Sequence, residues 1–213
     1  MSESSVRKKK MQEAEEKKQE SFAKVLIGDI IYLAVMCLIV FLILRFVGQR
    51  TTVNGDSMDP TLADGQSLIM DKLSYRFHDP ARFDIVIFPG PADETVEPTF
   101  FDRLLNRKPS SPYFIKRVIG LPGEKVQIRD GKVYINGEEL TDDVYGITDY
   151  IDNPGIAEEE LTLKEDEYFC LGDNRPVSYD SRYEAVGPVT RKEFVGKVWI
   201  RIWPLNLFGK VDK

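Results

Sequence analysis

The stretch YFIKRVIGLPGEKVQIRDGKVYING, residues 113–137, predicts an antiparallel β-sheet. Tyr113–Ile119 is rich in β-branched and aromatic residues and is followed by Gly-Leu-Pro-Gly, which is typical of a strand that ends in a turn. Lys125–Ile128 and Lys132–Ile135 flank Asp130-Gly131, and this dipeptide between two such segments is the strongest short-range signal for a β-hairpin. We therefore expect strands that pair with their neighbours in sequence.

The sequence on either side of this stretch extends the sheet. Asn136-Gly137 predicts a second tight turn, and four more segments have strand composition: Ser67–Met70, Asp84–Phe88, Glu167–Leu171 and Phe194–Trp203. Residues 92–112 and 142–161 show neither a strand nor a helix period, and we interpret them as excursions from the sheet. Because no amphipathic segment is long enough for a βαβ unit, residues 45–213 are expected to form a mostly β domain with an antiparallel, barrel-like sheet.

A long apolar segment precedes this domain. Residues 25–44 are apolar or small except for Asp29 and Tyr32, and at about 1.5 Å per residue they can span a hydrocarbon core of roughly 30 Å. A cleaved signal peptide is the competing interpretation, but the apolar run is too long for one and no small-x-small cleavage site follows it. We predict one transmembrane helix that stays attached.

The charge distribution predicts the orientation of this helix. Residues 1–24 form a charged tail that contains six lysines and Arg7, whereas only Arg45 and Arg50 follow the helix closely. This excess of basic residues before the helix predicts a cytoplasmic tail and places residues 45–213 outside, in a single-pass cell-membrane protein. The part after the helix holds 22 basic and 29 acidic residues, and its net charge of −7 argues against nucleic acid as a partner.

The chain has too few cysteine and histidine residues for an intramolecular disulfide or a zinc site. Cys37 lies in the apolar segment and Cys170 in the outer domain, so an intramolecular disulfide is not expected. His78 is the single histidine, and one His with one external Cys cannot form a zinc site. We expect neither a metal nor another cofactor.

Residues 54–62, NGDSMDPTL, are predicted to present a hydroxyl group in a rigid turn. Gly55 allows backbone conformations closed to other residues, and Pro60 fixes its own φ and restricts Asp59. Ser57 lies between these constraints, where its Oγ can reach a substrate. Taken alone, the same residues are more typical of an ordinary turn.

Lys116 is a candidate base. Alternation along its strand places Phe114, Lys116 and Val118 on one face and Arg117 on the other. A lysine that acts as a base needs its pKa lowered from about 10.4 to roughly 7.5, or about 4 kcal/mol, and burial between apolar neighbours shifts the pKa in that direction. A lysine on an edge strand with its amine in water is the alternative.

A polar segment, LGDNRPVSYDSR, occupies residues 171–182 directly after a predicted strand. Its density of Gly, Asp, Asn, Ser and Pro predicts a loop, which side-chain bonds to its own backbone would suffice to hold.

Together these segments resemble the bacterial type I signal peptidases, membrane-anchored serine proteases with a Ser/Lys dyad. The resemblance covers nearly all of residues 25–204 and rests on five features in one order. They are the uncleaved apolar anchor, Ser57–Leu62 (Ser-Met-x-Pro-Thr-Leu), Arg82–Phe88, Lys116–Gly123 (Lys-Arg-Val-Ile-Gly-Leu-Pro-Gly) and Gly172–Arg182 (Gly-Asp-Asn-Arg…Ser-x-Asp-Ser-Arg).

The resemblance implies roles for particular residues. Ser57 is expected to be the nucleophile, Lys116 the general base, and Ser178 the hydroxyl that orients the lysine amine. The backbone N–H of Ser57 is the expected oxyanion donor. Gly55 stands where some members add a Ser hydroxyl as a second donor, so that donor is not identified by the sequence.

The residues expected to support the site are Met58, Arg117, Asp173, Asp180 and Arg182. Because Arg117 is on the strand face opposite Lys116, we predict that it pairs with Asp173 or Asp180 and holds the 172–182 loop against the strand. The others are expected to have structural roles.

Signal-peptide-bearing preproteins are the substrates that the resemblance implies. Ser57 lies about a dozen residues beyond the apolar segment, so it is expected to work close to the outer face of the lipid bilayer. We expect an extended substrate to add as a strand beside the site, with small pockets for side chains such as Ala at the first and third positions before the cut. The pocket residues and the oligomeric state stay open.

Other kinds of protein also fit part of the sequence. A sortase-like transpeptidase has a similar anchor and outer β domain and would use Cys170 with His78, although a Cys within a strand is more often buried and structural. A membrane-anchored β domain that binds peptides without catalysis is a second alternative, against which the intact Ser57 and Lys116 count. Self-cleaving repressors share the dyad, but this chain has a membrane helix in place of a DNA-binding segment.

Overall fold

The computed structural model describes residues 24–41, 48–91, 112–145 and 150–211, and the chain divides into two compact units, Met1–Phe46 and Val47–Lys213. The first unit contains an 18-residue helix, Lys24–Phe41, with a mean hydropathy of 2.3. Its apolar side chains are exposed, as a helix surrounded by lipid requires. The helix covers the predicted span 25–44 up to residue 41, and residues 42–44 lie outside the described residues.

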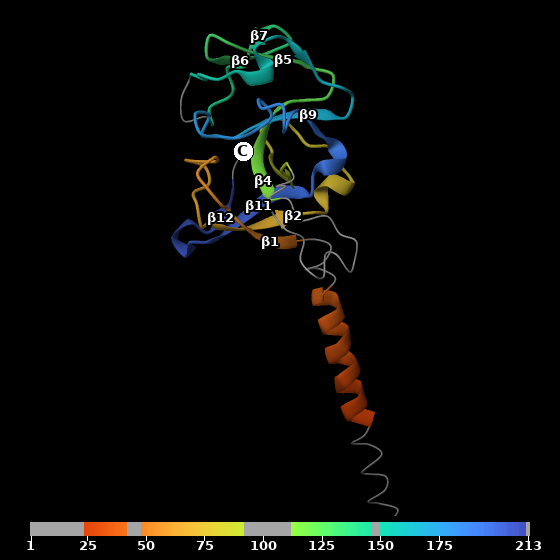
Figure 1. Ribbon diagram of the computed structural model, residues 1–213. Coiled ribbons are helices and arrows are strands. Elements are labelled where there is room, and N and C mark those ends of the chain that lie inside the picture. Colours follow the sequence, from red (N-terminus) through yellow and green to blue (C-terminus); the bar gives the residue numbers. More distant parts are fainter. Residues whose placement is uncertain (1–23, 42–47, 92–111, 146–149, 212–213) are drawn as a thin grey trace, which may run out of the picture. The chain divides into compact units, whose positions relative to one another are not determined.

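The described strands of the second unit form two antiparallel sheets (Figure 1). In the larger sheet the order is β1 (Gly48–Thr52), β2 (Ser67–Asp71), β11 (Gly196–Trp203), β3 (Ile85–Pro89), β4 (Tyr113–Gly120), β9 (Glu167–Leu171) and β10 (Val189–Thr190), and β12 (Gly209–Lys210) pairs with β11. In the smaller sheet the order is β7 (Glu138–Glu139), β6 (Lys132–Ile135), β5 (Lys125–Arg129) and β8 (Leu161–Thr162). Short 3-10 helices are η1 (Ser74–Arg76), η2 (Gly155–Ala157), η3 (Arg191–Glu193) and η4 (Leu205–Leu207). The prediction of a mostly antiparallel β domain is confirmed.

Both predicted tight turns form two-residue hairpin loops. Asp130 and Gly131 have φ angles of 50° and 72° between β5 and β6, and Arg129 pairs directly with Lys132. Positive φ at both loop positions matches the right-handed twist of the flanking strands, which is why Asp-Gly and Asn-Gly are favoured there. Asn136-Gly137 makes the same kind of turn between β6 and β7, with φ angles of 52° and 85°.

Buried side chains cover both faces of the larger sheet. Along β3, Ile85 and Ile87 pack into one hydrophobic cluster, and Val86 and Phe88 pack into a second cluster on the other face. This burial on both sides explains why β3 is a continuous apolar run rather than an alternating one. A third cluster combines side chains of β4 and β9 with side chains of β5 and β6, and so joins the two sheets.

Strand β4 has one edge that is only partly paired. Residues Tyr113–Arg117 pair with β3 along one edge, whereas on the other edge β9 pairs with Arg117, Val118 and Gly120. Among the described strands, Tyr113–Lys116 therefore has a backbone edge without a strand partner, directly beside the candidate base.

Some elements differ from the prediction. Strand β1 was not predicted, and β10 and β12 were not predicted either, because these strands have no alternating apolar pattern of their own. In the second predicted excursion, Leu161 begins β8 and pairs with Val126, so the excursion ends one residue earlier than expected. Residues 92–111 and 146–149 of the two excursions lie outside the described residues.

Candidate active site

Ser57 lies in a turn that is fixed at both ends. Gly55 has a φ of 84°, which favours glycine, and its N–H donates to Asp64 Oδ1 at 2.7 Å. After the serine, the N–H of Leu62 donates to the carbonyl of Met58 at 2.9 Å, and both side chains are buried in the first hydrophobic cluster. Met58 thus has the packing role that its sequence context predicted. This anchoring leaves the side chain of Ser57 at the surface of a cleft.

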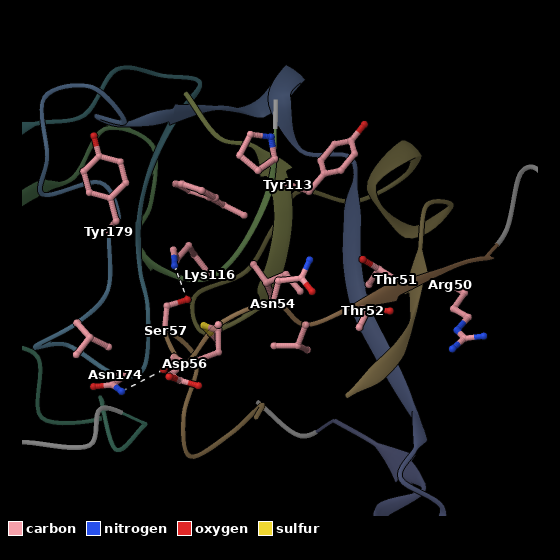
Figure 2. A pocket seen from close by; sticks show the side chains of 17 residues that line it. Arg50, Thr51, Thr52, Asn54, Asp56, Ser57, Tyr113, Lys116, Asn174 and Tyr179 are labelled. Carbon is pink, nitrogen blue, oxygen red and sulfur yellow. Dashed lines mark hydrogen bonds between the residues drawn. The ribbon is translucent and has the colours of Figure 1, made fainter. Parts of the chain in front are cut away.

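Lys116 meets Ser57 inside this cleft (Figure 2). Lys116 Nζ donates to Ser57 Oγ at 2.7 Å, across 59 residues of sequence. The lysine is 3% exposed, and its Nζ lies 5.2 Å from the centroid of the Phe114 ring, which agrees with their predicted shared face. A nucleophile and a base within hydrogen-bonding distance are the minimal apparatus for covalent catalysis.

Burial lowers the pKa of the Lys116 amine from 10.5 to about 8, because an apolar environment disfavours the ammonium form. Asp180 is the next largest influence and raises this pKa, whereas the neighbouring charge of Arg182 lowers it. Near neutral pH an appreciable fraction of the amine is therefore free to accept a proton.

The loop of residues 172–182 is attached to the Ser57 turn by hydrogen bonds from the backbone and the side chain of Asn174. Asn174 N–H donates to the carbonyl of Ser57 at 3.1 Å. Asn174 Nδ2 donates to the carbonyl of Asp56, also at 3.1 Å (Figure 2). Asn174 was not singled out from the sequence, although it lies within the Gly-Asp-Asn-Arg motif. These bonds fix the position of the nucleophile relative to the loop.

Gly172 is the point of closest approach between the loop and the turn. A methyl group at this position would overlap both Ser178 Oγ and the carbonyl oxygen of Ser57. The φ of Gly172 is not in the left-handed region, so space rather than backbone conformation requires glycine here.

We predict that Gly172→Ala lowers kcat/KM for the catalysed reaction at least tenfold, because the methyl group must push Ser57 away from Lys116 and small misplacements of reacting groups are costly. Gly48→Ala is the matched control, because there the nearest atom is a flexible Ile69 methyl at 3.3 Å. Steady-state kinetics of both variants measure the effect. Wild-type activity in Gly172→Ala would contradict this role.

Arg117 and Asp173 form a buried ion pair on the opposite side of β4. Arg117 Nε and Nη2 each donate to a different oxygen of Asp173 at 2.7 Å, and both side chains are fully buried. Of the two carboxylates predicted for Arg117, Asp173 is therefore the partner. Thr61 Oγ1 donates to the same carboxylate at 2.5 Å, and the guanidinium lies 3.8 Å from the Tyr145 ring centroid. The cluster ties β4, the loop and the residues after Ser57 together.

Asp180 pairs within its own loop. Arg182 Nε donates to Asp180 Oδ1 at 2.8 Å, and the N–H of Gly172 donates to Asp180 Oδ2 at 3.1 Å. Arg182 Nη2 also donates to the carbonyl groups of Arg175 and Ser178 at 2.7 and 3.1 Å. Asp180 and Arg182 thus hold the loop in shape, as their expected structural roles require.

Ser178 is buried, with 1% of its surface exposed, next to Gly172. Its Oγ has no hydrogen-bond partner among the described residues. The bond to Lys116 that an orienting role calls for is therefore not formed in this structure, and the role stays a proposal.

Cys170 and His78 are placed unsuitably for a thiol mechanism. Cys170 is fully buried in the cluster of Val86, Phe88 and Val118. Burial and the charge of Asp180 raise the pKa of its thiol, and a thiol kept protonated is a poor nucleophile. His78 is exposed and lines a separate small pocket with Phe77.

Comparisons with known proteins identify the family. A family model described as "Signal peptidase, peptidase S26" matches residues 26–203. A probable signal peptidase I-2 of Synechocystis sp. is 38% identical over 165 residues, which cover 77% of this chain and 67% of that protein. Signal peptidase IB of Staphylococcus aureus (strain Mu50) is 30% identical over 198 residues, which cover 87% of this chain and 93% of that protein. A crystal structure of a signal peptidase I from Enterococcus faecalis V583 is 36% identical, with 56% of this chain and 97% of that chain covered and a TM-score of 0.39.

The chain belongs to the signal peptidase family, peptidase S26. The signal peptidase I members of this family are serine endopeptidases that are anchored in a membrane and act on preproteins bearing signal peptides. The family predicted from the five sequence features is confirmed, and the helix Lys24–Phe41 suits such an anchor.

Proposed function

We propose that Ser57 and Lys116 of this protein cleave signal peptides from preproteins through an acyl-enzyme. The observation that carries this proposal is the 2.7 Å contact between Lys116 Nζ and Ser57 Oγ, made by a buried amine whose pKa is lowered to about 8. Neither a histidine nor a metal is needed, because a neutral lysine amine can take the serine proton directly.

The reaction takes two stages. Ser57 Oγ attacks the carbonyl carbon at the end of the signal peptide while Lys116 Nζ accepts the hydroxyl proton. The tetrahedral intermediate then breaks its C–N bond, Lys116 gives the proton to the departing amine, and the signal peptide stays on Ser57 as an ester. In the second stage Lys116 accepts a proton from an attacking water, and this proton returns to Ser57 Oγ when the ester bond breaks.

The backbone N–H of Ser57 is the proposed oxyanion donor. It donates no hydrogen bond to any of the described residues, so it is available to the developing charge. Gly55 has no side chain to act as a second donor. A single oxyanion donor is worth about 3 kcal/mol of transition-state stabilisation.

The edge of β4 at Tyr113–Lys116, which has no strand partner among the described residues, supports a binding mode for the substrate. Residues Tyr113–Lys116 offer backbone N–H and carbonyl groups along one side of the cleft, and an extended peptide can pair with such an edge. Val53 and Ile115 line the same cleft, and they are suited to contact small apolar side chains such as Ala before the cut. The residues before the cut therefore lie along β4 and end at Lys116.

The proposed domain organisation follows the sequence. Residues 1–24 form a cytoplasmic tail, residues 25–44 cross the membrane once, and residues 45–213 form the catalytic domain outside, where translocated preproteins emerge. The excess of Lys and Arg before the apolar segment supports this orientation.

We expect Ser178→Ala to lower kcat by about ten- to a hundredfold, because a lysine without its orienting hydroxyl spends less time aligned with Ser57. The variant should unfold at a temperature no lower than the wild type, since it removes a buried hydroxyl that has no partner among the described residues. Kinetics and thermal unfolding together separate the two effects. An unchanged kcat would remove the orienting role.

The proposal is tested with purified full-length protein in detergent and a preprotein substrate. Mass spectrometry of the product should show one cut directly after the signal peptide for the wild type. Ser57→Ala, which removes only one half-buried hydroxyl of a fixed turn, should show none. Cleavage by Ser57→Ala at the wild-type rate would mean that another group is the nucleophile.

A further inference from the structure

The cleft extends beyond the dyad on both sides. Figure 2 shows Ser57 and Lys116 near its middle, with Thr52 and Tyr113 towards one end and Tyr179 towards the other. The cleft has a volume of about 910 Å³, which is far more than a few small side chains before the cut would fill. The 172–182 loop forms the second end of the cleft, and the residues before the cut do not occupy it in the proposed binding mode.

The direction in which the substrate runs determines which of its residues contact this second end. In the proposed binding mode the residues before the cut pair with Tyr113–Lys116 and reach the dyad at Lys116. The residues after the cut must continue past Ser57, away from Tyr113. They consequently pass over the surface that the 172–182 loop contributes to the cleft, which is lined by Asn174, Val177 and Tyr179.

Val177 and Tyr179 give this surface an apolar part that is exposed, and contacts with other rings hold Tyr179 in place. Val177 is 62% exposed and Tyr179 is 41% exposed, although both line a cleft. The Tyr179 ring packs edge-on against Phe114 with centroids 6.2 Å apart, and its centroid lies 4.5 Å from that of Tyr183. Aromatic packing on two sides keeps the ring from collapsing into the cleft, so its free face stays open to a substrate.

The aromatic contacts also link this surface to the base. Phe114, which Tyr179 contacts, has its centroid 5.2 Å from Lys116 Nζ. A side chain that covers Tyr179 therefore lies one aromatic ring away from the reacting atoms. Covering exposed apolar surface is favourable, and here it also excludes water beside the amine.

We propose that Val177 and Tyr179 form a subsite for an apolar side chain in the first two residues of the mature protein. This inference rests on the proposed function and adds that selectivity extends to the mature side of the cut. Tyr179 acts here through substrate contact and takes no part in proton transfer.

The test uses full-length enzyme in detergent and preproteins that are identical up to the cut. Their first two mature residues are Ala-Ala, Leu-Ala, Ala-Leu or Asp-Ala, and kcat/KM is measured for each. The wild type should prefer the better of the two Leu substrates over Ala-Ala by about tenfold, in line with the discrimination that one apolar contact gives. Asp-Ala should be the poorest substrate.

Four variants test which side chains cause the preference. Tyr179→Ala should reduce the Leu-to-Ala ratio to about one, and Tyr179→Phe should keep it, because the ring rather than the hydroxyl makes the contact. Tyr113→Ala is the matched control, since it makes the same change at the other end of the cleft and should leave the mature-side ratio as in the wild type. Val177→Ser, at an exposed position that tolerates change, should also lower the ratio.

A wild-type ratio of one, or a ratio that survives in both Tyr179→Ala and Val177→Ser, would overturn the subsite. These results are distinct from a failure of the proposed function. If the wild type cuts each substrate once and Ser57→Ala cuts none, a flat ratio contradicts the subsite alone. If Ser57→Ala still cleaves, the proposed function itself is wrong.

Discussion

Replacing Lys116 with methionine is expected to lower kcat/KM for preprotein cleavage by at least about 1,000-fold, within the range that a general base contributes. The amine is the group within hydrogen-bonding distance of Ser57 Oγ, and without it the serine hydroxyl keeps its proton and is a weak nucleophile. Methionine has a similar length and no charge, so it fills the buried position without a cavity. Thermal unfolding and far-ultraviolet circular dichroism should match the wild type.

The control for this prediction is Lys116→Arg. Arginine keeps a positive charge at position 116 but cannot lose a proton in the working pH range, so it cannot act as a base. If the lysine were only a binding or structural cation, Arg would retain activity and Met would not. Activity above a few per cent of the wild type in the Arg variant would therefore contradict the proposed role.

The second large effect is expected for Arg117, whose replacement should lower the stability of the folded domain. We expect Arg117→Ala to lower the free energy of unfolding by about 3–5 kcal/mol, because it leaves the fully buried carboxylate of Asp173 without its partner. Activity should fall as well, since the same cluster joins β4 to the loop and to Thr61. Chemical denaturation followed by tryptophan fluorescence measures the change.

Arg129→Ala provides a matched control for the arginine substitution. Arg129 lies over the Tyr134 ring at 3.9 Å from its centroid, which is nearly the arrangement of Arg117 over Tyr145 at 3.8 Å. Arg129 is exposed, so its removal should change the free energy of unfolding by less than about 0.5 kcal/mol. Equal effects of the two substitutions would show that burial of the ion pair is not what makes Arg117 important.

The parts of the fold that local rules govern were predictable from the sequence. Asp130-Gly131 and Asn136-Gly137 determine their turns through the φ angles they allow, and the strands beside them follow. Strand β1 was missed because Gly-Gln-Arg-Thr-Thr has no apolar alternation, and its strand conformation comes from pairing with β2. Such pairing depends on residues nearly twenty positions away, which no local pattern reveals.

The site, like the fold, has contacts that the sequence predicted and contacts that it did not. Alternation along β4 placed Lys116 and Arg117 on opposite faces, and the contacts with Phe114 and Asp173 agree with that placement. That Ser57 lies beside Lys116 followed from the family resemblance and not from spacing. The contacts of Thr61 with Asp173 and of Asn174 with Asp56 join segments 112 and 118 residues apart. Their residue types gave no signal beyond ordinary turn chemistry.

The proposal as a whole requires that the amine of Lys116 is uncharged in a useful fraction of the enzyme. The measurement that tests this most directly is the pH titration of the Lys116 side chain by NMR in full-length protein with 13C-labelled lysine, with the signal assigned by its absence in Lys116→Met. We predict a midpoint near 8, because burial lowers the pKa. The value of kcat/KM should fall as the pH drops through the same midpoint, since the protonated amine cannot accept the serine proton. A Lys116 midpoint near 10.5, with activity that does not follow the titration, would contradict it.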